Sequence, residues 1–126
     1  MTYVASKEVV YAYTTGGCGH LALELRRLTG LPIVVHGNPV ALIHAGLWVN
    51  EFVLDVNGLT HASAWESQWR WGTSATQLLE DDEDVQDYFA GMSPFTKHNS
   101  RALARRLCNA FDIPTTGRRH RDALTH

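Results

Sequence analysis

The chain has 126 residues, a formal net charge of −2, 44% hydrophobic residues and 19% charged residues. This length suits one domain with a single core, and the ordinary apolar share excludes a chain that is disordered throughout. A dedicated nucleic-acid binder usually presents a strongly basic face, which this charge balance does not indicate. We therefore expect one domain over residues 1–114, a flexible basic tail over residues 115–126, and no nucleic-acid partner.

The sequence predicts neither a targeting segment nor a disulfide framework. The N-terminal residues show no signal-peptide pattern, and no apolar run approaches the roughly 18 residues that span a bilayer. Cys18 and Cys108 are the only two cysteines, and two thiols in different contexts do not make a disulfide framework. We expect a cytoplasmic protein with reduced thiols and no membrane association.

Cys18 opens the first element that the sequence predicts. Apolar side chains follow it at helical spacing, at Leu21, Leu25 and Leu28. Gly30 supplies a stop and Pro32 lies just beyond, so the pattern predicts a helix from about Cys18 to Thr29. Cys18 then lies in the first turn on the side that faces the core, where the free N–H groups of the helix favour a thiolate.

A sheet is predicted next. Residues 33–36 read as a short buried strand, followed by a turn at residues 37–39. Residues 40–49 and 52–56 are rich in strand formers, with Asn50 and Glu51 between them, and Asn57-Gly58 is expected to end the second strand. The pattern predicts a β-hairpin.

The register predicted for this hairpin places two polar residues on the same face. A loop centred on Asn50 and Glu51 places Gly46 opposite Asp55 and makes His44 the diagonal neighbour of Asp55 on the same face. Diagonal neighbours are about 7–8 Å apart at the backbone, within reach of a hydrogen bond between imidazole and carboxylate. Gly46 is expected to leave the space between them open. A slip of one residue would put Asp55 on the other face.

The later elements are less well defined. The stretch from Ala62 to Gly72 carries Trp65, Trp69 and Trp71, and Ala75 to Phe89 is expected to be helical in part. Trp65 and Trp69 lie at helical spacing, as core or lid residues or as a substrate-binding surface. A second amphipathic helix is expected from Asn99 or Ser100 to Phe111, with Ser100 as a candidate cap.

The charges form two clusters. An acidic run comprises Glu80, Asp81, Asp82, Glu83, Asp84 and Asp87, and a basic cluster near the C-terminus comprises Arg118, Arg119 and Arg121. We interpret them as the solvated start of a helix and a solvated tail. Either cluster is a candidate contact for a protein partner.

Cys18, His44 and Asp55 are the residue types that covalent acyl transfer requires: a nucleophile, a base and a residue that orients the base. The backbone N–H of Cys18, approached through Gly16-Gly17, is a first candidate for stabilising an oxyanion. The sequence does not decide which hydroxyl would be the second donor to the oxyanion; the candidates are those of Thr14, Thr15 and Tyr13. Trp48 lies on the same face of its strand as His44, where it would either line the site or pack in the core.

Each of the three residues also has a packing interpretation. Cys18 would then be a small buried residue at a helix end, His44 an ordinary strand histidine, and Asp55 a buried carboxylate with some other partner. The two glycines before Cys18 favour the nucleophile, because they let a substrate approach the backbone closely.

Metal and nucleotide sites are not indicated. Zinc ligands could come from Cys18, His20, His36, His44 and His61, but neither a CxxC pair nor a helical His-x-x-x-His motif occurs. The glycines at positions 16, 17 and 19 lack the Lys-Ser/Thr ending of a phosphate loop. We therefore expect no metal and no cofactor.

The order Cys18-Gly19-His20 at a helix start, His44 on a strand and Asp55 on the next strand resembles the papain-like cysteine hydrolase group, which includes transglutaminase-like enzymes and bacterial cell-wall peptidases. The resemblance covers about residues 12–58. It implies a papain-like α+β core in which a Cys-bearing helix packs on a small antiparallel sheet. It also implies that Cys18 is the nucleophile, His44 the base and Asp55 the orienting residue.

The same segment is similar to small actinobacterial and phage proteins with a Cys-Gly-His helix, a His-bearing strand and an Asp-x-x-Gly turn. Two positions depart from the papain pattern. Ala12 stands where papain-type enzymes have glutamine, six residues before the cysteine, and Gly19 replaces an aromatic residue. Because alanine donates no side-chain hydrogen bond, the oxyanion must be stabilised by another residue.

These observations predict a thiol hydrolase that cleaves an amide, peptide or isopeptide bond in a peptide or protein substrate. A transferase or deamidase with the same triad is the nearest alternative, since only the second nucleophile differs. The alternative from another class is a non-catalytic interaction protein that binds through its tryptophan-rich segment or its acidic run.

Overall fold

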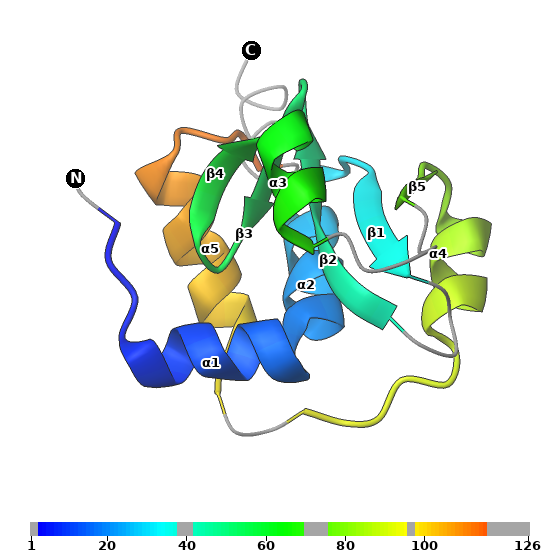
Figure 1. Cartoon of the computed structure of the whole chain (residues 1–126), viewed down its shortest axis with the longest axis horizontal. Helices are drawn as coiled ribbons and strands as arrows, with labels where there is room; N and C mark the ends of the chain where they lie inside the picture. Colours follow the sequence, from blue (N-terminus) through cyan, green and yellow to red (C-terminus); the bar gives the residue numbers. More distant parts are fainter. Residues whose placement is uncertain (1–2, 38–41, 70–75, 96–97, 116–126) are drawn as a thin grey trace, which may run out of the picture.

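The structure, a computed structural model, describes residues 3–37, 42–69, 76–95 and 98–115, and within these ranges the chain forms five helices and five strands. In chain order they are α1 (Lys7–Thr15), α2 (Cys18–Thr29), β1 (Ile33–Gly37), β2 (Leu42–Val49), β3 (Phe52–Asp55), β4 (Gly58–His61), α3 (Ala62–Trp69), β5 (Thr76–Leu79), α4 (Asp82–Phe89) and α5 (Ser100–Ala110). The strands form one antiparallel sheet in the order β4-β3-β2-β1-β5 (Figure 1). The predicted α+β class is confirmed.

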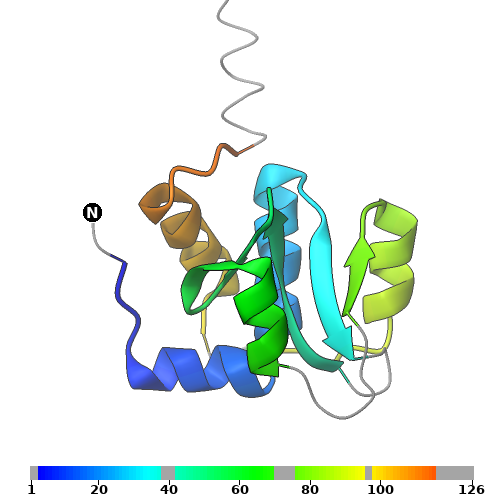
Figure 2. The same ribbon diagram turned by 45° about the horizontal axis from the view of Figure 1, so that its top comes forward.

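The two faces of the sheet are buried against different helices. On one face, Leu47 and Leu54 pack with Leu25 of α2. On the other face, Val53 packs with Trp65 of α3. Because successive side chains of a strand point to opposite faces, the sheet is covered by α2 on one side and by α3 on the other (Figure 2).

Helix α2 has the predicted bounds. It ends where Gly30 adopts a left-handed conformation, with φ of 74°, and donates its N–H to the carbonyl of Arg26. This geometry is a common helix stop that glycine adopts without steric cost. Cys18 lies in the first turn and is only 7% exposed, as expected for a residue that faces the core.

The predicted hairpin is also confirmed. Asn50 and Glu51 form its two-residue turn with φ values of 52° and 76°, a combination typical of turns whose twist matches that of the flanking strands. Leu47 pairs with Leu54 and continues the register set by this turn.

Several elements differ from the sequence-based expectations. The second strand of the hairpin ends before Asn57-Gly58, as expected, but β4, which follows and pairs with β3, was not predicted. The stretch expected to be partly helical begins with strand β5 before α4, and α1 was not predicted at all. Strands of four residues carry too little alternation to be recognised locally, and they are stabilised by pairing with neighbours. Residues 38–41, which hold most of the predicted turn and the start of the strand predicted from residue 40, lie outside the described residues.

The cap of the last helix is another correction. The side chain of Asn99 accepts a hydrogen bond from the N–H of Ala102 at 2.9 Å, so Asn99 rather than Ser100 caps α5. The hydroxyl of Ser100 instead hydrogen-bonds with that of Tyr13 at 2.8 Å, which ties α5 to α1.

The acidic run lies at the exposed start of α4, as expected. Asp81 caps this helix by accepting the N–H of Asp84 at 2.8 Å. The carboxylates of the first turn lie near the positive end of the helix dipole, which favours them there. Arg26 of α2 contacts Asp82 at 2.8 Å and so holds the start of α4 against α2.

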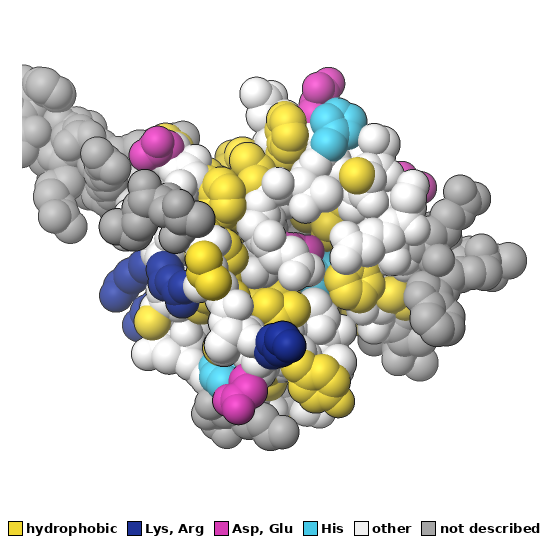
Figure 3. All heavy atoms as spheres, turned by 60° about the vertical axis from the view of Figure 1, so that its left-hand side comes forward, with side chains coloured by type: hydrophobic (Ala, Val, Ile, Leu, Met, Phe, Trp, Pro, Cys, Tyr) yellow, Lys and Arg dark blue, Asp and Glu magenta, His cyan; other side chains and the backbone are white. Residues whose placement is uncertain are grey.

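Basic side chains gather on another part of the surface. Exposed arginines of α5 are Arg101, Arg105 and Arg106, and Figure 3 shows Lys and Arg side chains gathered at one side of its face. The basic cluster predicted at positions 118–121 lies outside the described residues. In the described part of the chain, no helix is both long enough and apolar enough to cross a membrane.

The turn of the hairpin leads to a test of stability. We predict that Glu51→Gly raises the free energy of unfolding by about 0.5–1 kcal/mol, because glycine adopts a positive φ without the clash that a Cβ incurs. Urea-induced unfolding measures this change. Glu66→Gly within α3 is the control, and it should lower the free energy by about 1 kcal/mol. Equal destabilisation by both substitutions would contradict the turn geometry.

Candidate functional site

His44 and Asp55 meet across the β2–β3 hairpin, as the register predicts. Nε2 of His44 lies 2.8 Å from Oδ2 of Asp55 in a fully buried contact. The two residues are on neighbouring strands and share the sheet face that α3 covers. The hydrogen bond predicted from the hairpin parity is confirmed.

Gly46 does not leave an open space between these two residues. A Cβ at this position would lie 2.4 Å from Cγ1 of Val53 and 3.1 Å from the carbonyl oxygen of Leu54. The expectation of an open gap is therefore wrong. Glycine is needed here because Val53 packs directly over the backbone of β2.

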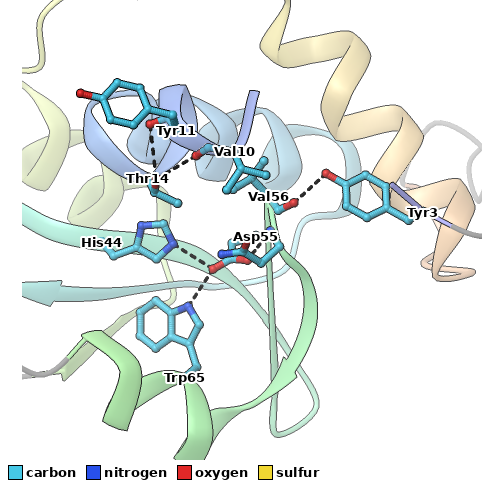
Figure 4. A network of polar contacts seen from close by, with 9 residues as sticks. Tyr3, Val10, Tyr11, Thr14, His44, Asp55, Val56 and Trp65 are labelled. Atoms are coloured by element: carbon cyan, nitrogen blue, oxygen red, sulfur yellow. Dashed lines mark hydrogen bonds and ion pairs between the residues drawn. The ribbon is translucent and has the colours of Figure 1, made fainter. Parts of the chain in front are cut away.

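Three donors from three parts of the chain hold the Asp55 carboxylate. Besides His44, the indole N–H of Trp65 donates to Oδ2 at 3.0 Å, and the backbone N–H of Asn57 donates to Oδ1 at 2.9 Å. Figure 4 shows the carboxylate between His44 of β2 and Trp65 of α3. These hydrogen bonds offset the cost of burying a carboxylate that is only 3% exposed.

The sequence did not predict that Trp65 donates a hydrogen bond to Asp55. The sequence offered one signal, which is the helical spacing of Trp65 and Trp69 just after the hairpin. Trp65 is 1% exposed and belongs to the core, in agreement with the core interpretation. Its indole N–H also positions Asp55, and only the tertiary structure shows this contact.

His44 is buried and positively charged at neutral pH. Burial by itself lowers the pKa of His44 by disfavouring the charged ring, but hydrogen bonds and negative charge from Asp55 and Cys18 outweigh it and raise the pKa to about 9. The ring also stacks on Trp69, with ring centroids 3.9 Å apart and an angle of 23° between the planes. An aromatic face favours such a cation.

Cys18 is the third member of the site. The charge of Cys18 adds to the raised pKa of His44, so the thiol lies near the imidazole ring, although Nδ1 of His44 has no hydrogen-bond partner among the described residues. Since Nε2 of His44 is bonded to Asp55, Nδ1 is the nitrogen left for Cys18. Gly17 is the N-cap of α2 and offers no side chain to its first N–H groups. The structure thus brings Cys18, His44 and Asp55 together.

The hydroxyls considered as second oxyanion donors are bonded elsewhere. Tyr13 directs its hydroxyl to Ser100 at 2.8 Å. Thr14 and Thr15 donate theirs to carbonyl oxygens of α1 itself. None of the three hydroxyls is free to serve the site in this arrangement.

The structure also shows the surroundings of Gly17, Gly16 and Trp48, the other residues that the sequence predicts near the site. A Cβ on Gly17 would lie 2.8 Å from the ring of Phe95 and 2.9 Å from that of Tyr13, so no larger residue fits here without displacing these rings. Gly16 has open space around it. Trp48 is half-buried on the His44 face and packs with the cluster between the sheet and α3.

In the part of the chain that the structure describes, most of the buried side-chain atoms that lack a hydrogen-bond partner belong to His44 and its surroundings, whereas Glu24 Oε2 lies apart from them, 3.5 Å from Nε of Arg101. Within the described residues, the buried side-chain atoms of this kind are Glu24 Oε2, His44 Nδ1, Trp69 Nε1 and the Tyr88 hydroxyl. Trp69 stacks on His44, and Tyr88 shares an apolar cluster with Cys18. Because buried polar atoms normally have partners, this concentration is typical of a place where a ligand supplies them.

The histidines considered as metal ligands have other contacts. His20 hydrogen-bonds with the carbonyl of Ser93 at 2.7 Å, and His36 with Thr76 at 2.8 Å. His61 pairs locally with Ser63. Among the described residues, no three His, Cys, Asp or Glu side chains are arranged to hold a metal ion.

Comparisons with known proteins found no relatives of this chain. No protein-family model matches the chain, and no curated protein or solved structure matches it. The assignment of a function therefore depends on the geometry and chemistry of Cys18, His44 and Asp55.

The raised pKa of His44 predicts a pH-dependent stability. The protonated ring stabilises the folded state fully below its unfolded pKa of about 6.5, and this contribution is lost as the pH rises through about 9. We expect the stability advantage of the wild type over His44→Gln to fall by roughly 3 kcal/mol over this range. Urea unfolding between pH 6 and pH 10 measures it. A constant difference across the range would contradict the charged, buried pair.

Proposed function

We propose that this protein is a cysteine hydrolase that cleaves an amide, peptide or isopeptide bond through an acyl-enzyme on Cys18. The observation that carries the proposal is the buried His44–Asp55 pair, whose 2.8 Å hydrogen bond leaves Nδ1 of His44 for the Cys18 thiol. A thiol beside an imidazolium at a helix N-terminus is favoured as the reactive thiolate.

The first half of the reaction forms the acyl-enzyme. The Cys18 thiolate attacks the substrate carbonyl carbon, a C–S bond forms, and the carbonyl electron pair moves to oxygen. When this tetrahedral intermediate collapses, the C–N bond breaks and the leaving amine takes a proton from Nδ1 of His44. Asp55 holds the imidazole in place through Nε2 during this transfer.

The second half returns the enzyme to its starting state. A water molecule attacks the thioester while His44 accepts its proton, and the C–S bond breaks to release a carboxylic acid. A transferase would use an amine in place of water, and a deamidase would release ammonia in the first half. All three share the acyl-enzyme, so the same residues are required.

The burial of Trp65 favours this proposal over the interaction-protein alternative. Trp65 is 1% exposed and donates its N–H to Asp55, so it is not available as an exposed binding residue. A tryptophan that positions a buried carboxylate next to a histidine supports a role in the site. The expected partner is the peptide or protein substrate.

Alkylation of Cys18 tests the reactive thiol directly. At pH 6 we expect iodoacetamide to label wild-type Cys18 at least ~10-fold faster than in His44→Ala, because the imidazolium favours the thiolate. Asp55→Asn should fall between the two. The advantage of the wild type should shrink as the pH rises through about 9, where His44 loses its proton.

The second cysteine serves as an internal control. Cys108 is 1% exposed, and burial raises the pKa of its thiol to about 11, so it should remain unlabelled at pH 6. His61→Ala, which removes an exposed histidine of β4, controls for histidine loss in general. A slow rate at Cys18 that does not depend on His44 would overturn the proposal and favour the interaction protein.

A further inference from the structure

Tyr88 of α4 has the one buried hydroxyl that lacks a hydrogen-bond partner in the described part of the chain. The side chain is 8% exposed. Burial, followed by the negative charge of Cys18, raises the pKa of Tyr88 to about 12. The phenol therefore keeps its proton at neutral pH and remains a donor without an acceptor.

Contacts at both ends of α4 align it with α2. At one end, Arg26 of α2 contacts Asp82 at 2.8 Å. At the other end, a Cβ on Gly19 would lie 3.0 Å from the ring of Phe89. Gly19 and Arg26 are seven residues apart, as are Asp82 and Phe89, which is a rise of about 10.5 Å along each helix. The two helices thus run in opposite directions, so the start of α4 lies beside the end of α2 and the end of α4 lies beside the start of α2.

Tyr88 lies near the Cys18 thiol, because the charge of Cys18 adds to the rise in the pKa of Tyr88. Both side chains belong to the same apolar cluster. The absence of a side chain at Gly19 allows the end of α4 to approach the first turn of α2 closely.

We propose that the Tyr88 hydroxyl is the second oxyanion donor of the site, acting together with the backbone N–H of Cys18. This inference rests on the proposed acyl-enzyme chemistry. When the carbonyl electron pair moves to oxygen, the oxyanion accepts a hydrogen bond from the phenol, and no proton is transferred. The oxyanion supplies the acceptor that Tyr88 lacks, and Tyr88 takes the place of the side-chain donor that Ala12 cannot provide.

Two probes that react differently with Cys18 test this assignment. Acetyl transfer from p-nitrophenyl acetate passes through a tetrahedral oxyanion, whereas alkylation by iodoacetamide is a direct displacement without one. In Tyr88→Phe we expect acetylation of Cys18 to slow by ~100-fold, as for the loss of one oxyanion donor. The rate of alkylation should stay within about twofold, because its transition state needs no such donor. The melting temperature should not fall, since no protein hydrogen bond is lost.

The possible results separate the two proposals. Tyr11→Phe, which removes an exposed hydroxyl of α1, is the matched control and should leave both rates unchanged. If Tyr88→Phe is acetylated as fast as the wild type, or if both reactions slow equally, Tyr88 is not an oxyanion donor, while the acyl-enzyme proposal stands. If Cys18→Ala releases p-nitrophenolate as fast as the wild type, the acyl-enzyme proposal fails and the role of Tyr88 fails with it.

Discussion

The carboxylate of Asp55 is nearly inaccessible to water, and the elements around it are arranged to supply its hydrogen bonds. Removing a carboxylate from water without such donors costs several kcal/mol. Its donors are His44 of β2, the N–H of Asn57 after β3, and Trp65 of α3. The hairpin and the helix on its outer face are therefore connected through one polar group. Removal of any of these donors would disturb both packing and chemistry.

The hairpin register decides whether this group exists. The turn at Asn50 and Glu51 places His44 and Asp55 on one face, and a slip of one residue would separate them. Val53 packs over Gly46 on the same face, so a larger residue at position 46 would push β2 and β3 apart. Turn geometry and side-chain packing thus select the same pairing, which gives His44 a fixed orientation.

Cys18 joins this pair at one end of the sheet, where apolar packing surrounds polar atoms that lack partners. The ring of His44 is stacked on Trp69 and charged, and the Tyr88 hydroxyl is buried near the thiol. A low-dielectric environment strengthens the interactions of charges and donors within it. Buried polar atoms without hydrogen bonds are costly, so His44 Nδ1, Trp69 Nε1 and the Tyr88 hydroxyl lower the stability of the fold.

Helix α2, the hairpin, its register and the His44–Asp55 contact could be predicted from the sequence. These depend on local periodicity, on a glycine stop and on a two-residue turn, all of which act over a few neighbouring residues. The sequence did not predict the contacts of Trp65, Trp69 and Tyr88, the pairing of β4 and β5, or the packing around Gly17. Those features depend on contacts between residues far apart in the chain. The local pattern of a tryptophan, a tyrosine or a glycine is the same whether it packs, donates or binds, and the distant neighbours decide which of these it does.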